Sequence, residues 1–211
     1  TRTYDRRVLT VPSATADEAL RLVQQQPQAA LEMARTVLGE EAGGTETAKA
    51  HWAVGMASRE LGDLTAARDE IQRAVTLAEP LGEDPLVARM LVSLALVHAY
   101  EGRIDEALEV LDRAEGLAEG AELAHVEMQR GVVVYWQGRI EESLAAYDRA
   151  LAMLRRAPDD LLEARVRANL GAALSWFGRL DAASEHLATA ARLADGLGQP
   201  AFAAITTASP P

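Results

Sequence analysis

Hydrophobic and small residues recur along this chain in one order that is repeated four times. Each unit has a glycine, a polar residue, a leucine or isoleucine, two further residues and a small residue. The four glycines are Gly62, Gly102, Gly138 and Gly178, and they are 40, 36 and 40 residues apart. A period of this length is typical of solenoids built from one repeated supersecondary unit.

The flanking positions predict what each unit is. A small residue precedes each glycine by seven positions, and a bulky apolar residue and an alanine follow it by nine and twelve positions. This spacing predicts a first helix, a glycine turn and an amphipathic second helix that packs closely on the first. The first helices are expected near residues 45–61, 84–101, 121–137 and 159–177. The second helices are expected near residues 64–79, 104–118, 140–156 and 180–196.

A weaker helical pair precedes these four units. Thr15 and Glu18 have the spacing of a capping box that begins a helix reaching about residue 25, and Pro27 breaks the chain before a second helix to about residue 40. We therefore expect an N-terminal tail over 1–14 and an all-α solenoid of antiparallel helix pairs over 15–198. Residues 199–211 are expected to form a C-terminal tail or the start of a truncated capping helix. The chain begins with Thr1, so we expect it to be a piece of a longer protein.

Composition supports the helical prediction and narrows the function. Hydrophobic residues make up 49% of the chain, aromatic residues only 4%, and 42 residues are alanine, which favours helix over sheet. The net charge of −11 argues against nucleic-acid binding. The absence of cysteine excludes disulfides and thiolate chemistry, and the four histidines lack metal-ligand spacing. We expect a cytoplasmic, non-enzymatic protein without a membrane segment, cofactor or metal.

The repeated pattern resembles the tetratricopeptide repeat, and the resemblance covers residues 15–198. The Gly-Arg-Ile/Leu turns, the Gln129-Arg130-Gly131 run and the alanine-rich style also resemble actinobacterial arrays that precede a CHAT (caspase-like) peptidase domain. The resemblance implies a right-handed superhelix with four full repeats and a degenerate N-terminal pair. The chain departs from the general repeat at Glu127 and Arg130, where an aromatic and an apolar residue are usual.

The resemblance also implies that the first helices line a concave groove. The groove-facing positions carried over from the family are Lys49, Trp52, Met56, Arg59, Arg89, Tyr100, His125, Tyr135, Trp136, Arg165 and Trp176. This set is basic and aromatic on an acidic chain. Exposed aromatic rings and arginines would suit a peptide with acidic side chains. Alternatively, Tyr100, Trp136 and Trp176 fill the space between neighbouring hairpins.

Three functions fit these observations. We expect a protein-protein interaction module that binds a peptide or protein segment in its groove. The first alternative is the regulatory or substrate-recognition array of a larger CHAT-type peptidase, whose catalytic His and Cys could not both lie in this cysteine-free chain. The second alternative is a scaffold that self-associates through its terminal repeat faces.

Overall fold

A computed structural model describes residues 15–40 and 43–197, and this part of the chain consists of helices and turns without any strand. The predicted tails, over 1–14 and from residue 198 onward, lie outside the described residues. The all-α fold class is confirmed, and every predicted helix is present with its ends within three residues of the expected positions. The helices are α1 (Ala16–Leu22), α2 (Pro27–Gly39), α3 (Gly44–Glu60), α4 (Leu64–Ala78), α5 (Asp84–Tyr100), α6 (Ile104–Glu115), α7 (Ala121–Trp136), α8 (Ile140–Leu154), α9 (Asp160–Trp176) and α10 (Leu180–Gly196), with a 3₁₀ turn η1 (Glu79–Leu81).

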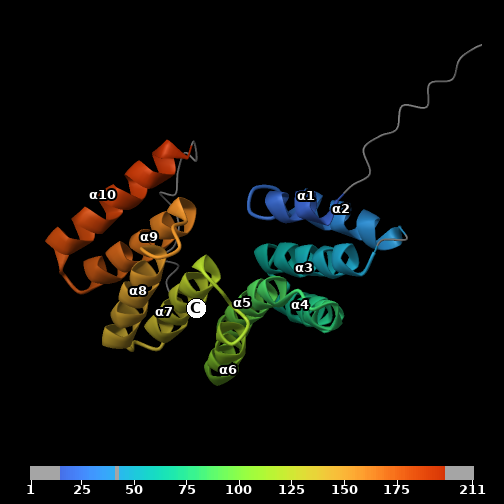
Figure 1. The fold of residues 1–211 in the computed structure, drawn as a ribbon, viewed down its shortest axis with the longest axis horizontal. Helices are drawn as coiled ribbons and strands as arrows, with labels where there is room; N and C mark the ends of the chain where they lie inside the picture. The colour runs from blue at the N-terminus through green and yellow to red at the C-terminus, as the bar shows by residue number, and fades with distance from the viewer. Residues whose placement is uncertain (1–14, 41–42, 198–211) are drawn as a thin grey trace, which may run out of the picture. The chain divides into compact units, whose positions relative to one another are not determined.

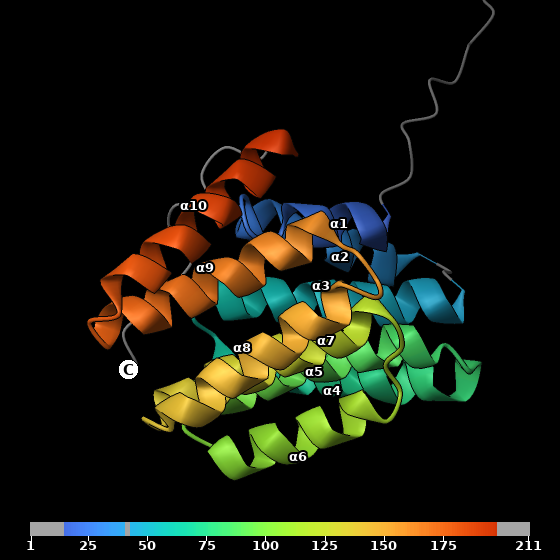
Figure 2. The same ribbon diagram turned by 60° about the vertical axis from the view of Figure 1, so that its left-hand side comes forward.

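The chain divides into two compact units, Thr1–Leu77 and Ala78–Pro211. The boundary falls at the last residue of α4. Within the second unit the helices pair in chain order, α5 with α6, α7 with α8 and α9 with α10, as Figure 1 shows by colour. Because consecutive helices are antiparallel, α5, α7 and α9 run in the same direction, and α7 lies between α5 and α9 (Figure 2).

In the first unit, α1 and α2 pack against α3. Val23, Leu31 and Val54 contribute to a buried core shared by these three helices. Thr15 begins α1 as the capping box predicts, since its hydroxyl accepts from the Glu18 N–H at 3.2 Å. The N-terminal pair therefore shares the core of its unit.

The recurring glycines end the first helices, as predicted. All four have a positive φ, between 69° and 85°, which disfavours any residue with a side chain. In the third hairpin the Gly138 N–H donates to the Tyr135 carbonyl at 2.9 Å and the Arg139 N–H to the Val134 carbonyl at 3.1 Å. This hydrogen-bond pair satisfies carbonyls that the helix end would leave unpaired. The same pair occurs in the other three hairpins.

The small residues before each turn allow the two helices of a hairpin to approach. A Cβ placed on Gly131 would lie 2.6 Å from Cε1 of Tyr147, and one placed on Gly55 would lie 2.5 Å from Cγ1 of Ile71. Both distances are far below van der Waals contact, so a larger residue at either crossing would force its neighbour to shift. In both pairs the bulky residue lies sixteen positions after the glycine, and the close approach of the two helices is as predicted.

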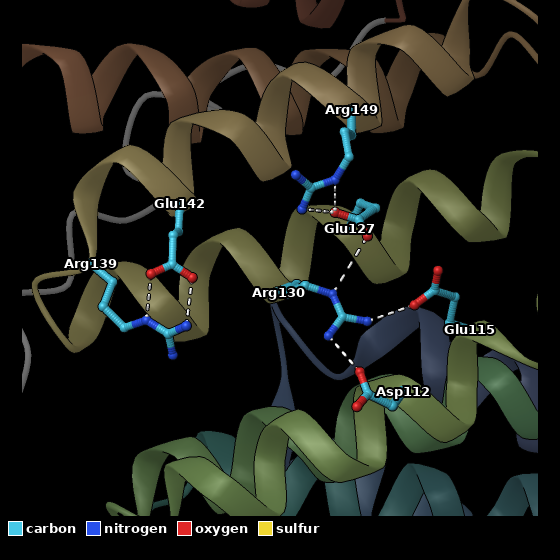
Figure 3. Close-up of polar contacts among 7 residues, drawn as sticks. All are labelled: Asp112, Glu115, Glu127, Arg130, Arg139, Glu142 and Arg149. Atoms are coloured by element: carbon cyan, nitrogen blue, oxygen red, sulfur yellow. Dashed lines mark hydrogen bonds and ion pairs between the residues drawn. The ribbon is translucent and has the colours of Figure 1, made fainter.

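The two residues that depart from the family pattern form an ionic network (Figure 3). Glu127 is buried and its carboxylate lies 2.8 Å from the Arg149 guanidinium on α8 and 3.5 Å from Arg130. Arg130 in turn contacts Asp112 at 2.7 Å and Glu115 at 2.8 Å on α6. The network therefore adds charged contacts between the α5–α6 hairpin and the α7–α8 hairpin.

Candidate functional site

The predicted groove residues of the second unit lie at two levels on the first helices α5, α7 and α9. Arg89, His125 and Arg165 are near the helix starts, and Tyr100, Trp136 and Trp176 are the last residues of the same three helices. In each helix the two predicted positions are eleven residues apart. Eleven residues correspond to about three helical turns, so both members lie on one face and about 16 Å apart along the axis.

Charged groups from the three helices meet at the first level, which we call the cationic level (Arg89, Glu122, His125, Arg165). Nε of Arg89 lies 3.9 Å from Oε1 of Glu122, and Nδ1 of His125 lies 3.7 Å from Oε2 of the same carboxylate. Glu122 was not among the predicted residues, although its place three positions before His125 puts it on the same helix face.

The protonation of His125 reflects this setting. Burial lowers the pKa of His125; its interaction with Glu122 opposes the shift, and the positive charges of Arg165 and Arg89 add to it. At neutral pH the imidazole is therefore uncharged. The four residues of the cationic level then carry two guanidinium charges against one carboxylate, a local positive excess on a chain with a net charge of −11.

The second level is the aromatic level (Tyr100, Tyr135, Trp136, Trp176). The rings of Tyr100 and Trp136 have centroids 5.0 Å apart and are tilted by 48°, so these two residues pack on each other across α5 and α7. Tyr135 packs against the core between α7, α8 and α9, and burial raises the pKa of its hydroxyl. Trp176 differs, because 65% of its surface is exposed. The aromatic residues of this level thus range from packed to open.

The predicted groove residues of the first unit lie on α3, where internal contacts hold several of them. Nζ of Lys49 lies 3.0 Å from the Asp17 carboxylate of α1. Trp52 is buried, and Met56 packs against the core of α1, α2 and α3. Arg59 forms an ion pair with the neighbouring Glu60.

Two other kinds of site are absent from the described helices and turns. No group of three His, Asp or Glu side chains within 15–40 and 43–197 could hold a metal ion. In the same part of the chain, no helix is both long and apolar enough to cross a bilayer.

The family model of the tetratricopeptide repeat matches residues 46–120 and 122–195. These matches cover most of the chain, and the chain belongs to the tetratricopeptide repeat family. No protein of curated function matches the sequence.

Solved structures share the fold at low sequence identity. PlcR of Bacillus thuringiensis, solved with the peptide PapR7 and DNA, has a TM-score of 0.71 and 17% identity; the match covers 87% of this chain and 69% of PlcR. The Rap conjugation gene regulator of plasmid pLS20, solved with the Phr* peptide, has a TM-score of 0.73 and 14% identity, covering 87% and 54%. BtubC of P. vanneervenii has a TM-score of 0.62 and 17% identity, covering 87% and 78%.

Family membership defines the general mode of action. The tetratricopeptide repeat is a protein-interaction module, and such repeats make up most of this chain. Which residues form its binding face, and what chemistry its partner has, depends on the charges and rings of the two levels.

Proposed function

We propose that the face formed by α5, α7 and α9 binds an acidic peptide or an acidic segment of a protein. The observation that carries this proposal is the cationic level, where Arg89 and His125 lie close to one carboxylate, Glu122. The positive charge of Arg165, on the third helix, is near enough to lower the pKa of His125. Guanidinium groups bind carboxylates through paired N–H donors, and His125 can add a positive charge when an anion arrives.

The spacing of the two levels defines the ligand further. The cationic and aromatic levels are about 16 Å apart, which corresponds to about five residues of extended chain. Trp176, the most exposed aromatic side chain of the aromatic level, offers contact area to an apolar side chain. The ligand is therefore a short segment with an acidic group and an apolar or aromatic group roughly five residues apart.

The comparisons support a peptide as the ligand class. PlcR and the Rap regulator share this fold, and their structures contain the peptides PapR7 and Phr*. The acidity of the partner is proposed from the charges of this chain alone. That the α3 residues Lys49, Trp52, Met56 and Arg59 contribute to the groove stays a prediction.

Display selection tests the proposal. A phage library of short random peptides is selected on the purified chain and, in parallel, on the variant Arg89→Ala/Arg165→Ala. A matched control, Arg155→Ala/Arg156→Ala, removes two exposed arginines at the end of α8 and changes the net charge equally. We expect peptides rich in Asp and Glu to be enriched on the wild type and the control, but not on the first variant. Enrichment of neutral or basic peptides, or equal enrichment on all three proteins, would refute an acidic ligand.

The association with a CHAT-type peptidase also remains a proposal drawn from the resemblance in the turns. The reading frame that flanks this segment tests it: a following domain with a His and Cys pair would support a regulatory array, and its absence would contradict one.

A further inference from the structure

The outer face of α10 exposes large apolar side chains that the other hairpins bury. Leu187 is 42% exposed, whereas Leu111 and Tyr147, at the same repeat position, are 0% and 2% exposed. Leu180, one heptad earlier, is 64% exposed. Leucines seven residues apart lie on one side of a helix, so they form an apolar edge along the helix that ends the described part of the unit.

Beside these leucines, α10 differs from α8 at the positions that pack on a following hairpin. In α8, Leu144 and Leu151 pack against the core that α8 shares with α9. The equivalent positions in α10 are Ser184 and Ala191, both of which are small. A helix that crosses α10 can therefore approach its backbone more closely than α9 approaches α8.

The opposite edge of the same face carries complementary charges. Glu185 and Arg192 are exposed and seven residues apart, and the Arg192 guanidinium donates to the Thr189 hydroxyl at 3.0 Å, one turn back along the helix. Two residues placed symmetrically about a point on a helix face each other when a second copy is laid antiparallel across that point. For Glu185 and Arg192 this point lies between Ala188 and Thr189.

We propose that a second copy of this chain docks here, with the two α10 helices antiparallel about a two-fold axis near Ala188. Glu185 of each copy then faces Arg192 of the other, so the ion pair forms twice. Ser184, Ala188 and Ala191 form the seam, and Leu180 and Leu187 cover one side of it. This surface is separate from the α5, α7 and α9 face, so self-association and peptide binding are independent.

Sedimentation equilibrium over a range of protein concentrations tests the proposal. The wild-type mass is expected to rise with concentration from 22.6 kDa toward twice that value. Glu185→Arg and Arg192→Glu alone each place like charges opposite one another twice, and each is expected to raise the dimer dissociation constant about tenfold or more. Circular dichroism verifies that each variant retains the wild-type helicity.

The decisive sample is an equal mixture of the two single variants. In a heterodimer, the arginine introduced into one copy would face the glutamate introduced into the other, and the unchanged Arg192 would face the unchanged Glu185. Mixing is therefore expected to restore the dimer. Glu109→Arg, an exposed charge reversal on α6, is the control and is expected to dimerise as the wild type does. A wild type that stays at 22.6 kDa, or variants that fail to restore dimerisation when mixed, would overturn the antiparallel α10 pairing and leave the face to another segment or partner.

Discussion

The carboxylate of Glu127 lies 2.8 Å from the guanidinium of Arg149, with only 7% of the Glu127 side chain exposed. This contact crosses from α7 to α8 at a position where the family usually has an aromatic residue. Burying a carboxylate is costly unless it is paired and hydrogen-bonded, and here Arg149 and Arg130 supply the pairing. The stability of the α7–α8 hairpin therefore depends on Arg149 and Arg130, whereas a repeat with an aromatic residue at this position would need no such pairing.

Removal of Arg149 tests this dependence. Arg149→Ala leaves Glu127 buried with one remaining guanidinium, at 3.5 Å, and is expected to lower the free energy of unfolding by about 1–2 kcal/mol. Urea denaturation of this variant, of Glu127→Gln and of the double variant gives the coupling energy of the pair. The control is Arg139→Ala, which breaks an exposed ion pair with Glu142 and should leave the stability nearly unchanged. Equal losses for Arg149→Ala and the control would show that the buried pair has no special role.

The close approach of α7 and α8 predicts a second stability effect. Gly131→Ala would place its Cβ 2.6 Å from Cε1 of the buried Tyr147, which must then shift within a packed core. We expect a loss of about 1–3 kcal/mol in thermal or urea unfolding. Gly116→Ala is the matched control, because it has a negative φ and its nearest neighbouring atom would lie 3.5 Å away. If Gly131→Ala were as stable as Gly116→Ala, the crossing would be looser than described.

The tryptophans that end α7 and α9 are expected to differ. Trp136 packs on Tyr100, so Trp136→Ala should lower the free energy of unfolding by about 1–3 kcal/mol. Trp176 is 65% exposed, and Trp176→Ala should change the stability by less than about 0.5 kcal/mol. Chemical denaturation of both variants therefore separates the packing and binding interpretations of these positions. A large loss for Trp176→Ala would assign its ring to packing as well.

The setting of His125 predicts how stability changes with pH. Because burial lowers the pKa of His125 in the folded chain, the unfolded chain binds more protons once the pH falls below about 7. The free energy of unfolding is therefore expected to decrease as the pH is lowered from about 7 to about 5.5, and His125→Gln should reduce that decrease. Urea denaturation at each pH measures the free energy of unfolding of both proteins. If His125→Gln had the same pH dependence as the wild type, the lowered pKa of His125 would be contradicted.

Peptide binding should show the opposite dependence at the same residue. An acidic group bound near Arg89 and Arg165 favours the charged imidazole, so the affinity should rise as the pH falls and binding should take up a proton at His125. Calorimetry in buffers of different ionisation enthalpy measures this uptake. His186→Gln is the control: burial also lowers the pKa of His186, but that residue lies on α10. Proton uptake unchanged in His125→Gln would remove His125 from the ligand contact.

The helices could be predicted from the sequence because their signals are local. A glycine that needs a positive φ, a small residue opposite a bulky one and a proline near a helix start each act within one hairpin, and the structure has all of them in their expected places. The family assignment follows from the same spacing. The glycine turn and the pairing of a small with a bulky position repeat four times, so each unit supports the interpretation of the others.

Whether each predicted groove side chain is exposed, buried or ion-paired could not be predicted from the sequence, because this depends on residues that are distant in sequence. The family resemblance placed Lys49 on the groove face, but only the structure shows Asp17, 32 residues earlier, as its partner. Trp52 and Trp176 were assigned to the same face, yet one is 6% and the other 65% exposed. Glu127 and Arg130 were recognised as departures from the family, but the carboxylates and arginine that pair with them could not be identified from spacing.

The most direct test of the central claim is a calorimetric titration of the most enriched acidic display peptide into three proteins: the wild type, Arg89→Ala/Arg165→Ala and Arg155→Ala/Arg156→Ala. If the cationic level of α5, α7 and α9 binds the peptide, the first variant raises the dissociation constant about tenfold or more and weakens its dependence on salt, while the second binds as the wild type does. Equal affinity for all three proteins, or an equal loss in both variants, would contradict the proposed site.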